Sequence, residues 1–568
     1  MDRRIRQIAG LLTLLLLAVA GSAGWVQGLR AENVAQNEPC DPDDQTDCAR
    51  NRFRIFAECR WERGPILSID GQVLAESARA PEGRRCLYER TYPAEGLVSH
   101  VVGQWSLHYG KTGLEKTYNA ELIGEPLPAK SIGDLFRQRP RVGNTLVSTI
   151  DTRLQNEALS GLEGRRGGVV ALNPKTGAVL VAASNPSYDP NPLASNDRAE
   201  ADRARCDLGV GVKRLSDGTP LRDESGNFVE CENAAAPLLS VALQARRPPG
   251  SSFKVVTAAA ALESGKYSPD QPTVPFSGAY TAPGDTRPIR NFGGGSCGGS
   301  LANALRVSCN TAFAQIGVDI GPDRLLSTAH AMGFDQFGGP AFVGCDGESV
   351  ADIDLTRTGC LPSKIIRYGA DGAPVGEERL ETPAFRARAG FGQWVLQASP
   401  FGMAQVAATV ANGGFVPRPR FAERVIDRAG TTVKEIRTGV GPTAISPEAA
   451  GQLAQMMRRV VTAGTAAGAL GGFSPPVAGK TGTAQQPSCA GDEAAIFGEG
   501  CGRLPHAWFL AFAPLDDPTI AIAVLVERGG GTNEAATGGR VAAPIARRVL
   551  DAYFKLYPTA AGVNGDDE

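Results

Sequence analysis

Two short apolar runs joined by a tight turn place the strongest constraint on the fold. Residues 167–172 and 178–183 each have the length of a strand, and Asn173-Pro174-Lys175-Thr176-Gly177 joins them into a hairpin. Both faces of each run are apolar, so the hairpin must be covered on both sides, which predicts helices flanking a sheet. Three further strands are predicted late in the chain, at 477–485, 507–512 and 519–526. The sheet is therefore expected to combine distant parts of the chain.

Changes in composition divide the chain into four segments. Residues 1–30 contain three arginines near the start and then no charged side chain from 7 to 29. This length can span a bilayer, with the arginines on the cytoplasmic side, so we expect an uncleaved single-pass anchor in the cell membrane. A cleaved signal peptide is the alternative, and both readings export the rest of the chain. We expect a mixed pedestal domain at 31–165, a larger domain at 166–556 and a mobile tail at 557–568.

The composition excludes several function classes. The 58 basic and 60 acidic side chains nearly balance, which argues against nucleic acid as a partner. None of the four histidines has metal-ligand spacing and there is no Cys-x-x-Cys pair, so we expect neither a metal site nor a cofactor. The twelve cysteines fall as sequence neighbours, which predicts local disulfides outside the cytoplasm. The pairs expected from proximity are 40 with 48, 59 with 86, 206 with 231, 297 with 309, 345 with 360, and 489 with 501.

The segment between the early and late strands is predicted to be mostly helical, with interruptions. Helices are expected there at 257–262, 301–307 and 400–411, and another begins where Ser446 caps Pro447. After the late strands, an amphipathic helix is expected at 542–554. The glycine-rich stretch 291–299 is expected to be a loop. Irregular excursions that carry cysteines are expected at about 191–237 and 337–388.

A nucleophile and a base lie one helical turn apart at the head of an alanine-rich helix. Pro248, Pro249 and Gly250 end any earlier helix, which places Ser251 at the cap or in the first turn. Lys254 then shares the helix face with Ser251. Burial would lower the pKa of its amine, so that Lys254 could take the proton of Ser251. A capping serine followed by a surface lysine is the simpler reading of this motif alone.

Two other polar groups follow in a characteristic order. Ser308-Cys309-Asn310 interrupts helical sequence, and Lys480-Thr481-Gly482-Thr483 opens a late strand. This order, Ser-x-x-Lys, Ser-x-Asn, Lys-Thr-Gly, is typical of penicillin-binding proteins and serine β-lactamases. Single motifs arise easily, because Lys-Thr-Gly also occurs at 111–113 and 175–177 and Ser-Gly-Asn at 225–227. We interpret these three copies as structural.

The chain resembles the class B penicillin-binding proteins, which are membrane-anchored peptidoglycan D,D-transpeptidases. The matching segments are 249–254, 306–313, 479–484, 507–509, 399–404, 412–414, and 63–66 with 70–77 in the pedestal. The resemblance implies a serine β-lactamase-like (penicillin-binding) transpeptidase domain, α+β with a central sheet flanked by helices, at 166–556. It also implies that β-lactams acylate the same serine, and that a membrane glycan polymerase is a partner.

The resemblance also assigns roles to the motif residues. Ser251 would attack a stem peptide that ends in D-Ala-D-Ala, with Lys254 as base, and an amine of a neighbouring stem would then form the cross-link. Ser308 would relay a proton to the leaving amine, and Asn310 would hold Lys254 and the substrate amide. The remaining roles are binding of the terminal carboxylate by Lys480, Thr481, Gly482 and Thr483, and an oxyanion hole from the N–H groups of Ser251 and Thr483.

Other functions share parts of this pattern. A D,D-carboxypeptidase or a β-lactamase needs a water positioned for deacylation, and no acidic residue is placed beside Ser251 by the sequence. A penicillin sensor needs a cytoplasmic signalling domain, whereas only six residues are expected on that side. An inactive scaffold is disfavoured because all three motifs are intact. For Cys309 we expect a small buried filler or a disulfide to Cys297.

Overall fold

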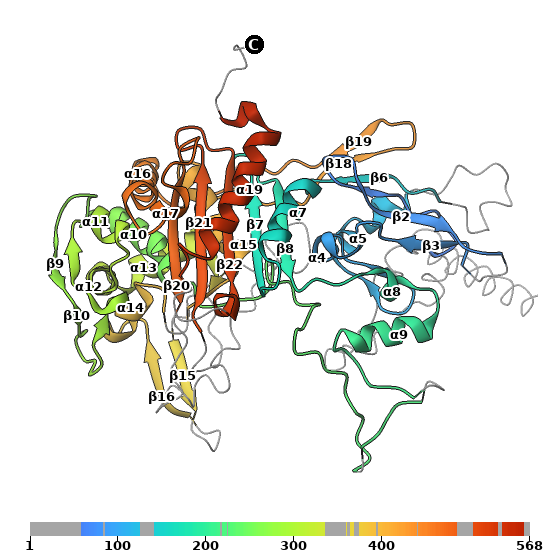
Figure 1. The fold of residues 1–568 in the computed structure, drawn as a ribbon, viewed down its shortest axis with the longest axis horizontal. Coiled ribbons are helices and arrows are strands. Elements are labelled where there is room, and N and C mark those ends of the chain that lie inside the picture. The colour runs from blue at the N-terminus through green and yellow to red at the C-terminus, as the bar shows by residue number, and fades with distance from the viewer. Residues whose placement is uncertain are drawn as a thin grey trace, which may run out of the picture.

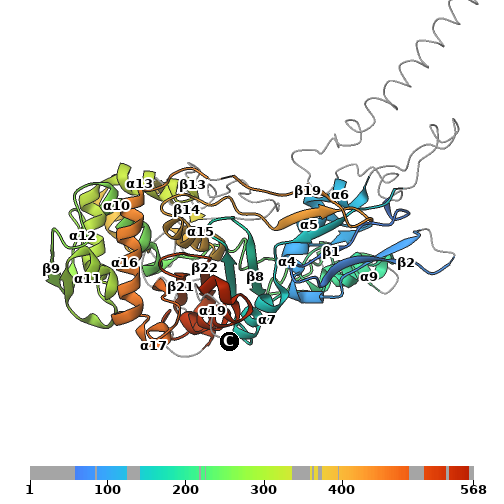
Figure 2. The ribbon, with the colours of Figure 1, turned by 90° about the horizontal axis from the view of Figure 1, so that it is seen from above.

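The protein consists of a larger domain around a five-stranded sheet and a smaller pedestal beside it (Figures 1 and 2). These two parts lie side by side along the longest axis of the molecule. The computed structural model describes residues 58–82, 86–124, 141–215, 219–223, 225–335, 359–360, 364–368, 374–393, 396–439, 441–484, 504–531 and 537–561.

The central sheet joins strands from both ends of the larger domain. Its order is β20-β21-β22-β7-β8, and every neighbouring pair is antiparallel. The predicted hairpin is confirmed as β7 and β8, and the three late strands are confirmed as β20, β21 and β22. Their bounds are Gly167–Leu172 for β7, Val179–Asn185 for β8, Ala478–Ala484 for β20, His506–Ala513 for β21 and Ile520–Val526 for β22.

Helices cover both faces of this sheet, as the apolar strands require. On one face α19 (Ala542–Leu556) packs against β21, β22 and α7 (Thr152–Gly161). On the other face α15 (Pro400–Ala411) packs against β7, β21 and β22, and α16 (Pro447–Ala463) packs against β20. The predicted cap of α16 is present, because the hydroxyl of Ser446 accepts the N–H of Ala449. The sheet core is thereby closed to solvent.

A helical lobe stands beside β20 and completes the larger domain. Its central helix α10 contacts its neighbours α11, α12, α13 and α16. The helices are α10 (Lys254–Glu263), α11 (Leu301–Arg306), α12 (Asn310–Ile320), α13 (Pro322–Ala331) and α14 (Pro383–Ala389), with α17 (Ala467–Leu470) following α16. Short strands at its edge are β9 (Val274–Ser277), β10 (Ala279–Tyr280), β11 (Ile289–Arg290) and β12 (Cys297–Gly299).

Two expectations for this lobe were wrong. Residues 291–299 are not all loop, because β12 pairs with β9 in antiparallel register. Gly298 allows this close pairing, since a Cβ there would lie 2.6 Å from Pro275 O. The excursion at 337–388 is not irregular throughout, because it contains the hairpin β15 (Lys364–Tyr368) and β16 (Pro374–Arg379) and ends in α14. Thr382 caps α14 and Pro383 follows it, which is a typical helix start. The glycine-rich sequence around it predicted an irregular segment instead.

The pedestal is a second sheet that the larger domain's chain completes. Its order is β19-β18-β6-β1-β2-β3. The early strands are β1 (Ile66–Leu67), β2 (Val73–Arg79), β3 (Tyr88–Thr91) and β6 (Thr145–Ser148), and the late ones are β18 (Ala422–Ile426) and β19 (Thr432–Glu435). The segment 422–435 was expected in the larger domain. It lies here because β18 pairs antiparallel with β6.

Short elements and a buried ion-pair group fill the rest of the pedestal. Glu115 is fully buried between Arg63 and Arg90, whose Nε atoms donate at 2.5 and 2.6 Å. The short elements are α4 (Ser99–Val102), β4 (Trp105–Ser106), β5 (Gly110–Lys111), α5 (Gly113–Thr117), α6 (Asn119–Ile123), α8 (Asn191–Ala194) and α9 (Arg198–Asp207).

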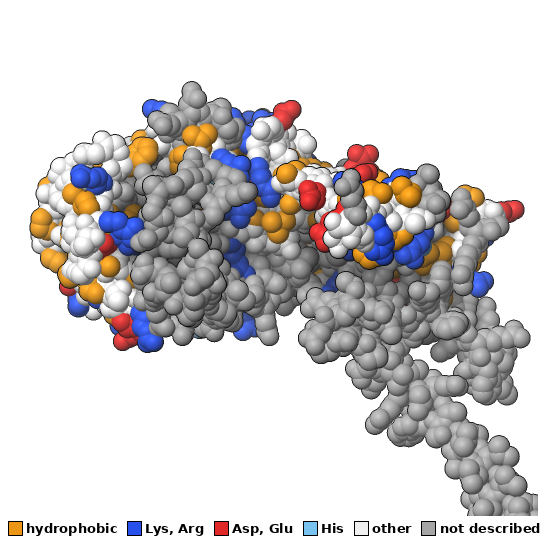
Figure 3. Space-filling view, turned by 90° about the horizontal axis from the view of Figure 1, so that it is seen from below, with side chains coloured by type: hydrophobic (Ala, Val, Ile, Leu, Met, Phe, Trp, Pro, Cys, Tyr) orange, Lys and Arg blue, Asp and Glu red, His pale blue; other side chains and the backbone are white. Residues whose placement is uncertain are grey.

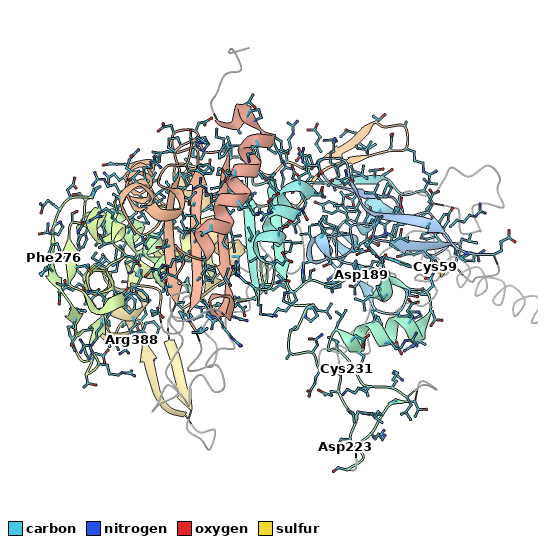
Figure 4. The ribbon with its side chains drawn as sticks, in the orientation of Figure 1. Cys59, Asp189, Asp223, Cys231, Phe276 and Arg388 are labelled. Atoms are coloured by element: carbon cyan, nitrogen blue, oxygen red, sulfur yellow. A yellow bond between two sulfur atoms is a disulfide. The ribbon has the colours of Figure 1, made fainter. Side chains whose placement is uncertain are left out.

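Three of the predicted disulfides lie within the described residues and are formed. They join Cys59 to Cys86, Cys206 to Cys231 and Cys297 to Cys309. The second closes the excursion at 191–237, whose tip projects from the body, with Cys231 nearer the body than Asp223 (Figure 4). The other three predicted pairs involve cysteines whose side chains the structure does not describe.

The two ends of the chain bear on the remaining expectations. No helix among the described residues is long and apolar enough to cross a membrane, and the expected anchor at 1–30 lies outside them. The expected tail begins with ordered structure, because 558–561 form a 3₁₀ turn and the hydroxyl of Tyr557 donates to Asp151 at 2.6 Å. Residues 562–568 lie outside the described part.

Candidate active site

Ser251 and Lys254 lie where a 3₁₀ turn runs into α10. The turn spans Gly250–Phe253 and α10 begins at Lys254, so the predicted first-turn position of Ser251 is correct. Ser251 is half-buried, whereas Lys254 is fully buried. The turn is held by the hydroxyl of Ser252, which donates to Pro249 O at 2.6 Å, and by Trp508 Nε1, which donates to Pro248 O at 2.9 Å. The nucleophile candidate therefore has a fixed backbone.

The second motif forms the turn between α11 and α12. Ser308 has a φ of 60°, which is unusual for a residue other than glycine and is a position of backbone strain. Asn310 opens α12 directly after it. Cys309 is buried and bonded to Cys297 of β12, as expected for a disulfide that pins this turn.

The third motif lies on β20, directly beside the serine turn. A Cβ on Gly482 would lie 2.8 Å from Trp508 Cβ and 2.9 Å from Pro249 O. Gly250 has a φ of +54°, and a Cβ there would lie 2.6 Å from Thr483 O. Glycine at both positions therefore allows the turn and the strand to touch.

The two lysines join the three motifs through hydrogen bonds. Lys254 Nζ donates to Ser308 O and to Asn310 Oδ1, each at 2.7 Å, and to Ser308 Oγ at 3.3 Å. Lys480 Nζ donates to Ser308 Oγ at 2.9 Å and to Thr481 O at 2.7 Å. Asn310 Nδ2 in turn donates to Arg290 O at 3.0 Å. Ser308 is thus the shared partner of both amines.

Burial makes both amines poor cations. Burial, and after it the charge of Lys480, lowers the pKa of Lys254 well below its usual value. Burial alone lowers the pKa of Lys480 to about 7. These shifts favour a neutral Lys254 that can act as a base, and near pH 7 Lys480 is still partly charged.

A cavity of about 500 Å³ opens in front of these groups. Ser251, Ser308, Asn310, Thr481 and Thr483 line it, and both lysines lie buried behind its wall. The other lining residues are Asn291, Phe292, Gly295, Ser296, Cys297, Val307, Gln393, Thr465, Thr537, Gly538, Gly539 and Arg540. The volume suits a small peptide end or a comparable ligand.

Thr465 and Arg540 are among the polar residues of this cavity that the sequence analysis missed. Thr465 lies between α16 and α17, and its hydroxyl is 2.5 Å from the hydroxyl of Thr481. Arg540 is exposed and lies just before α19. Neither belongs to a motif with fixed spacing, so no local signal identified it.

The extra motif copies lie away from this cavity. Lys111 pairs with Glu58 in the pedestal, and Lys175 pairs with Asp517 at the β7–β8 turn. Ser225 lies in the projecting excursion. His506 begins β21 and is buried. Within the described ranges, no group of His, Cys, Asp or Glu residues could hold a metal ion.

Comparisons with known proteins agree with this geometry. A family model described as "Penicillin binding protein transpeptidase domain" matches residues 167–551, and "Penicillin binding protein A dimerisation domain" matches residues 63–146. The chain is 32% identical to the peptidoglycan D,D-transpeptidase PbpA of Mycobacterium tuberculosis, over 98% of this chain and 100% of that protein. It is 29% identical to the peptidoglycan D,D-transpeptidase MrdA of Haemophilus influenzae, over 78% of this chain and 63% of that protein.

The chain is also similar to a solved structure of a related protein that carries a β-lactam acyl group. The ceftriaxone acyl-enzyme complex of M. tuberculosis penicillin-binding protein A superposes with a TM-score of 0.69 at 31% identity, covering 88% of this chain and 99% of that chain.

Proposed function

The chain belongs to the penicillin-binding protein transpeptidase family and is a peptidoglycan D,D-transpeptidase, and we propose that Ser251 is its nucleophile and Lys254 its general base. The observation that supports these roles is that a fully buried Lys254 donates to both Ser308 and Asn310, three residues from an accessible Ser251.

The first half-reaction forms an ester. Ser251 Oγ attacks the carbonyl carbon of the penultimate D-alanine and gives its proton to the neutral amine of Lys254. The N–H groups of Ser251 and Thr483 stabilise the oxyanion, each donor contributing about 3 kcal/mol. The carbon–nitrogen bond then breaks, and the leaving D-alanine amine takes a proton through Ser308. This leaves an acyl-enzyme on Ser251.

The second half-reaction transfers the acyl group. An amine of a neighbouring stem peptide attacks the ester carbonyl, an amide bond forms, and Ser251 recovers its proton. β-Lactams enter the first half-reaction only, and the ester that they form persists. A water molecule in place of the amine would give a carboxypeptidase.

We assign the terminal carboxylate to the β20 side of the cavity. Lys480 supplies positive charge behind the wall, and the hydroxyls of Thr481 and Thr483 line the cavity itself. Thr465 fixes the hydroxyl of Thr481 by sharing a hydrogen bond with it. A cation with convergent hydroxyls is a suitable receptor for a carboxylate.

Intact-mass measurement of the full chain in detergent tests these roles. A labelled penicillin should add one stable adduct, which is lost in Ser251→Ala and formed at least about 100-fold more slowly in Lys254→Ala. Lys480→Ala should slow formation of the adduct. Lys175→Ala, in the Lys-Thr-Gly copy at the β7–β8 turn, should leave that rate unchanged. A persisting adduct in Ser251→Ala contradicts the assignment. A D-Ala-D-Ala peptide with and without an acceptor amine then separates transfer from hydrolysis.

We further propose that residues 1–30 anchor the protein in the cell membrane, with the catalytic domain outside the cytoplasm and a membrane glycan polymerase as partner. The support is the absence of charge from 7 to 29 after three arginines. Protease added to intact spheroplasts should cleave the catalytic domain, and the protein should stay in the membrane fraction at high salt. Co-purification of a polymerase should be lost when another anchor replaces residues 1–30.

A further inference from the structure

A second cavity lies at the end of the central sheet. Its volume is about 530 Å³. It is formed by the segments before β7, after β8 and after β22, which lie two to four strands, about 10–20 Å, from β20. The lining residues are Gly164, Arg165, Arg166, Asn185, Pro186, Ala234, Ala235, Ala236, Leu239, Arg247, Glu527 and Arg528. The proposed acylation does not use this cavity.

Four arginines and one carboxylate give the cavity a large excess of positive charge. Glu527 is 6% exposed, and its Oε2 accepts from Arg166 Nε at 3.1 Å. Its Oε1 lies 3.0 Å from Arg247 Nη2 but receives no hydrogen bond from any described residue. Arg165 and Arg528 form no ion pair within the described part of the chain. The walls therefore carry three positive charges more than negative ones.

Two buried histidines nearby feel the charges of these arginines. Burial lowers the pKa of His506 to about 3, with the charge of Arg247 contributing. Burial likewise lowers the pKa of His100 to about 4, and Arg166 acts in the same direction. In Figure 3, which views the molecule from below, Lys and Arg side chains gather near the middle of the face.

We propose that this cavity binds a carboxylate of a peptidoglycan stem peptide, outside the acylation cavity. Guanidinium groups hold carboxylates in two-point contacts, and the volume is that of a ligand site. Peptide carboxylates are the anions that the enzyme's own polymer brings to this sheet end. The proposal rests on the transpeptidase function for the identity of the ligand.

The cavity is also connected to the nucleophile through the chain. Arg247 lies four residues before Ser251. Its backbone N–H donates to Ala398 O, and its backbone O accepts from the N–H of Ala398. A peptide held by these arginines would therefore be bound beside the segment that carries the serine turn, at the same sheet end as Thr483.

Binding of N-acetylmuramyl-tripeptide to the full chain, with Ser251 blocked by penicillin, tests the proposal. This probe lacks D-Ala-D-Ala, and the acylation cavity is filled, so calorimetric binding reports another site. We expect binding to persist after the block and to weaken at least tenfold in Arg528→Glu. Arg459→Glu, an exposed charge reversal on α16, is the matched control and should bind as the wild type does. Arg165→Gln provides a second variant if Arg528→Glu fails to fold.

Several results would overturn the proposal. Penicillin could abolish tripeptide binding, Arg528→Glu and Arg165→Gln could both leave it unchanged, or a tripeptide with amidated carboxylates could bind equally well. Displacement of the tripeptide by equimolar inorganic phosphate would indicate a phosphate site instead. The penicillin adduct on Ser251, measured in the same samples, reports the transpeptidase assignment separately.

Discussion

Lys254 Nζ and Lys480 Nζ lie 3.3 and 2.9 Å from the same atom, Ser308 Oγ. Two buried ammonium groups this close would repel each other strongly, so one of them must be neutral. Lys254 is that group, because burial and the charge of Lys480 both lower its pKa. A neutral Lys254 donates its two protons to Ser308 O and Asn310 Oδ1 and retains a lone pair for catalysis.

The pH dependence of penicillin acylation follows from these two amines. Acylation should rise with pH as Lys254 deprotonates, and this limb should lie well below the usual range of a lysine because burial and the charge of Lys480 lower its pKa. It should fall again near pH 7, as Lys480 loses the charge that attracts the carboxylate. The second-order rate constant between pH 4 and 10 reports both limbs for the free enzyme. A rate that climbs steadily to pH 10 would contradict the assignment.

Replacement of Asn310 by aspartate should move the rising limb. A carboxylate 2.7 Å from Lys254 favours the ammonium and raises its pKa. We expect the limb to shift to higher pH and acylation at pH 7 to fall at least about tenfold. Asn310→Ala removes the same hydrogen bonds without adding charge, so it should slow acylation with little shift. Asn227→Asp, in the exposed Ser-Gly-Asn copy, is the matched control.

Gly482→Ala should push the serine turn away from β20. Its Cβ would lie 2.8 Å from Trp508 Cβ and 3.0 Å from Ser252 N, and both neighbours are buried. We expect a loss of ~1–3 kcal/mol in the free energy of unfolding. Displacement of Ser251 should slow acylation about 100-fold. A Cβ at Gly451, in α16, would meet no atom within 4 Å. Gly451→Ala should therefore raise the free energy of unfolding by about 1 kcal/mol in denaturation experiments and leave the acylation rate unchanged.

Thr465 should act on carboxylate binding through Thr481. Thr465→Val keeps the shape but removes the hydroxyl that bonds to Thr481 Oγ1 at 2.5 Å. We expect the affinity for penicillin before acylation to fall about fivefold to tenfold, with the acylation step itself little changed. Thr465→Ser retains the hydroxyl and should restore the affinity in stopped-flow measurements. Equal defects in both variants would show that the role is packing alone.

Local patterns predicted those parts of the fold that local physics determines. The apolar runs at β7, β8, β21 and β22 have the length and composition of buried strands. The Ser446-Pro447 pair is a typical helix start. The three motifs were predictable as a site because each needs a special backbone: a turn before a helix, a turn between helices and a strand edge.

Long-range pairing explains what the sequence did not reveal. Nothing within 422–435 indicates that β18 pairs with β6, some 275 residues earlier, because strand register is set by the partner and not by the strand. Thr465 is similar, since it meets Thr481 only because α16 packs on β20. The glycines of 291–299 predicted a loop, whereas Gly298 lies in β12, where its lack of a side chain allows close pairing with β9.

The disulfide between Cys297 and Cys309 should matter for both stability and rate. It closes a loop between residues 12 apart and holds the residue next to Ser308, whose φ of 60° is strained. Replacing both cysteines by serine should cost about 2–4 kcal/mol of the free energy of unfolding. It should also slow acylation, because Ser308 can relax out of reach of Lys254 and Lys480. Replacing Cys206 and Cys231 instead should lower stability without changing the rate, since they close a distant excursion. An unchanged acylation rate in the first pair would show that the α11–α12 packing alone holds Ser308 in place.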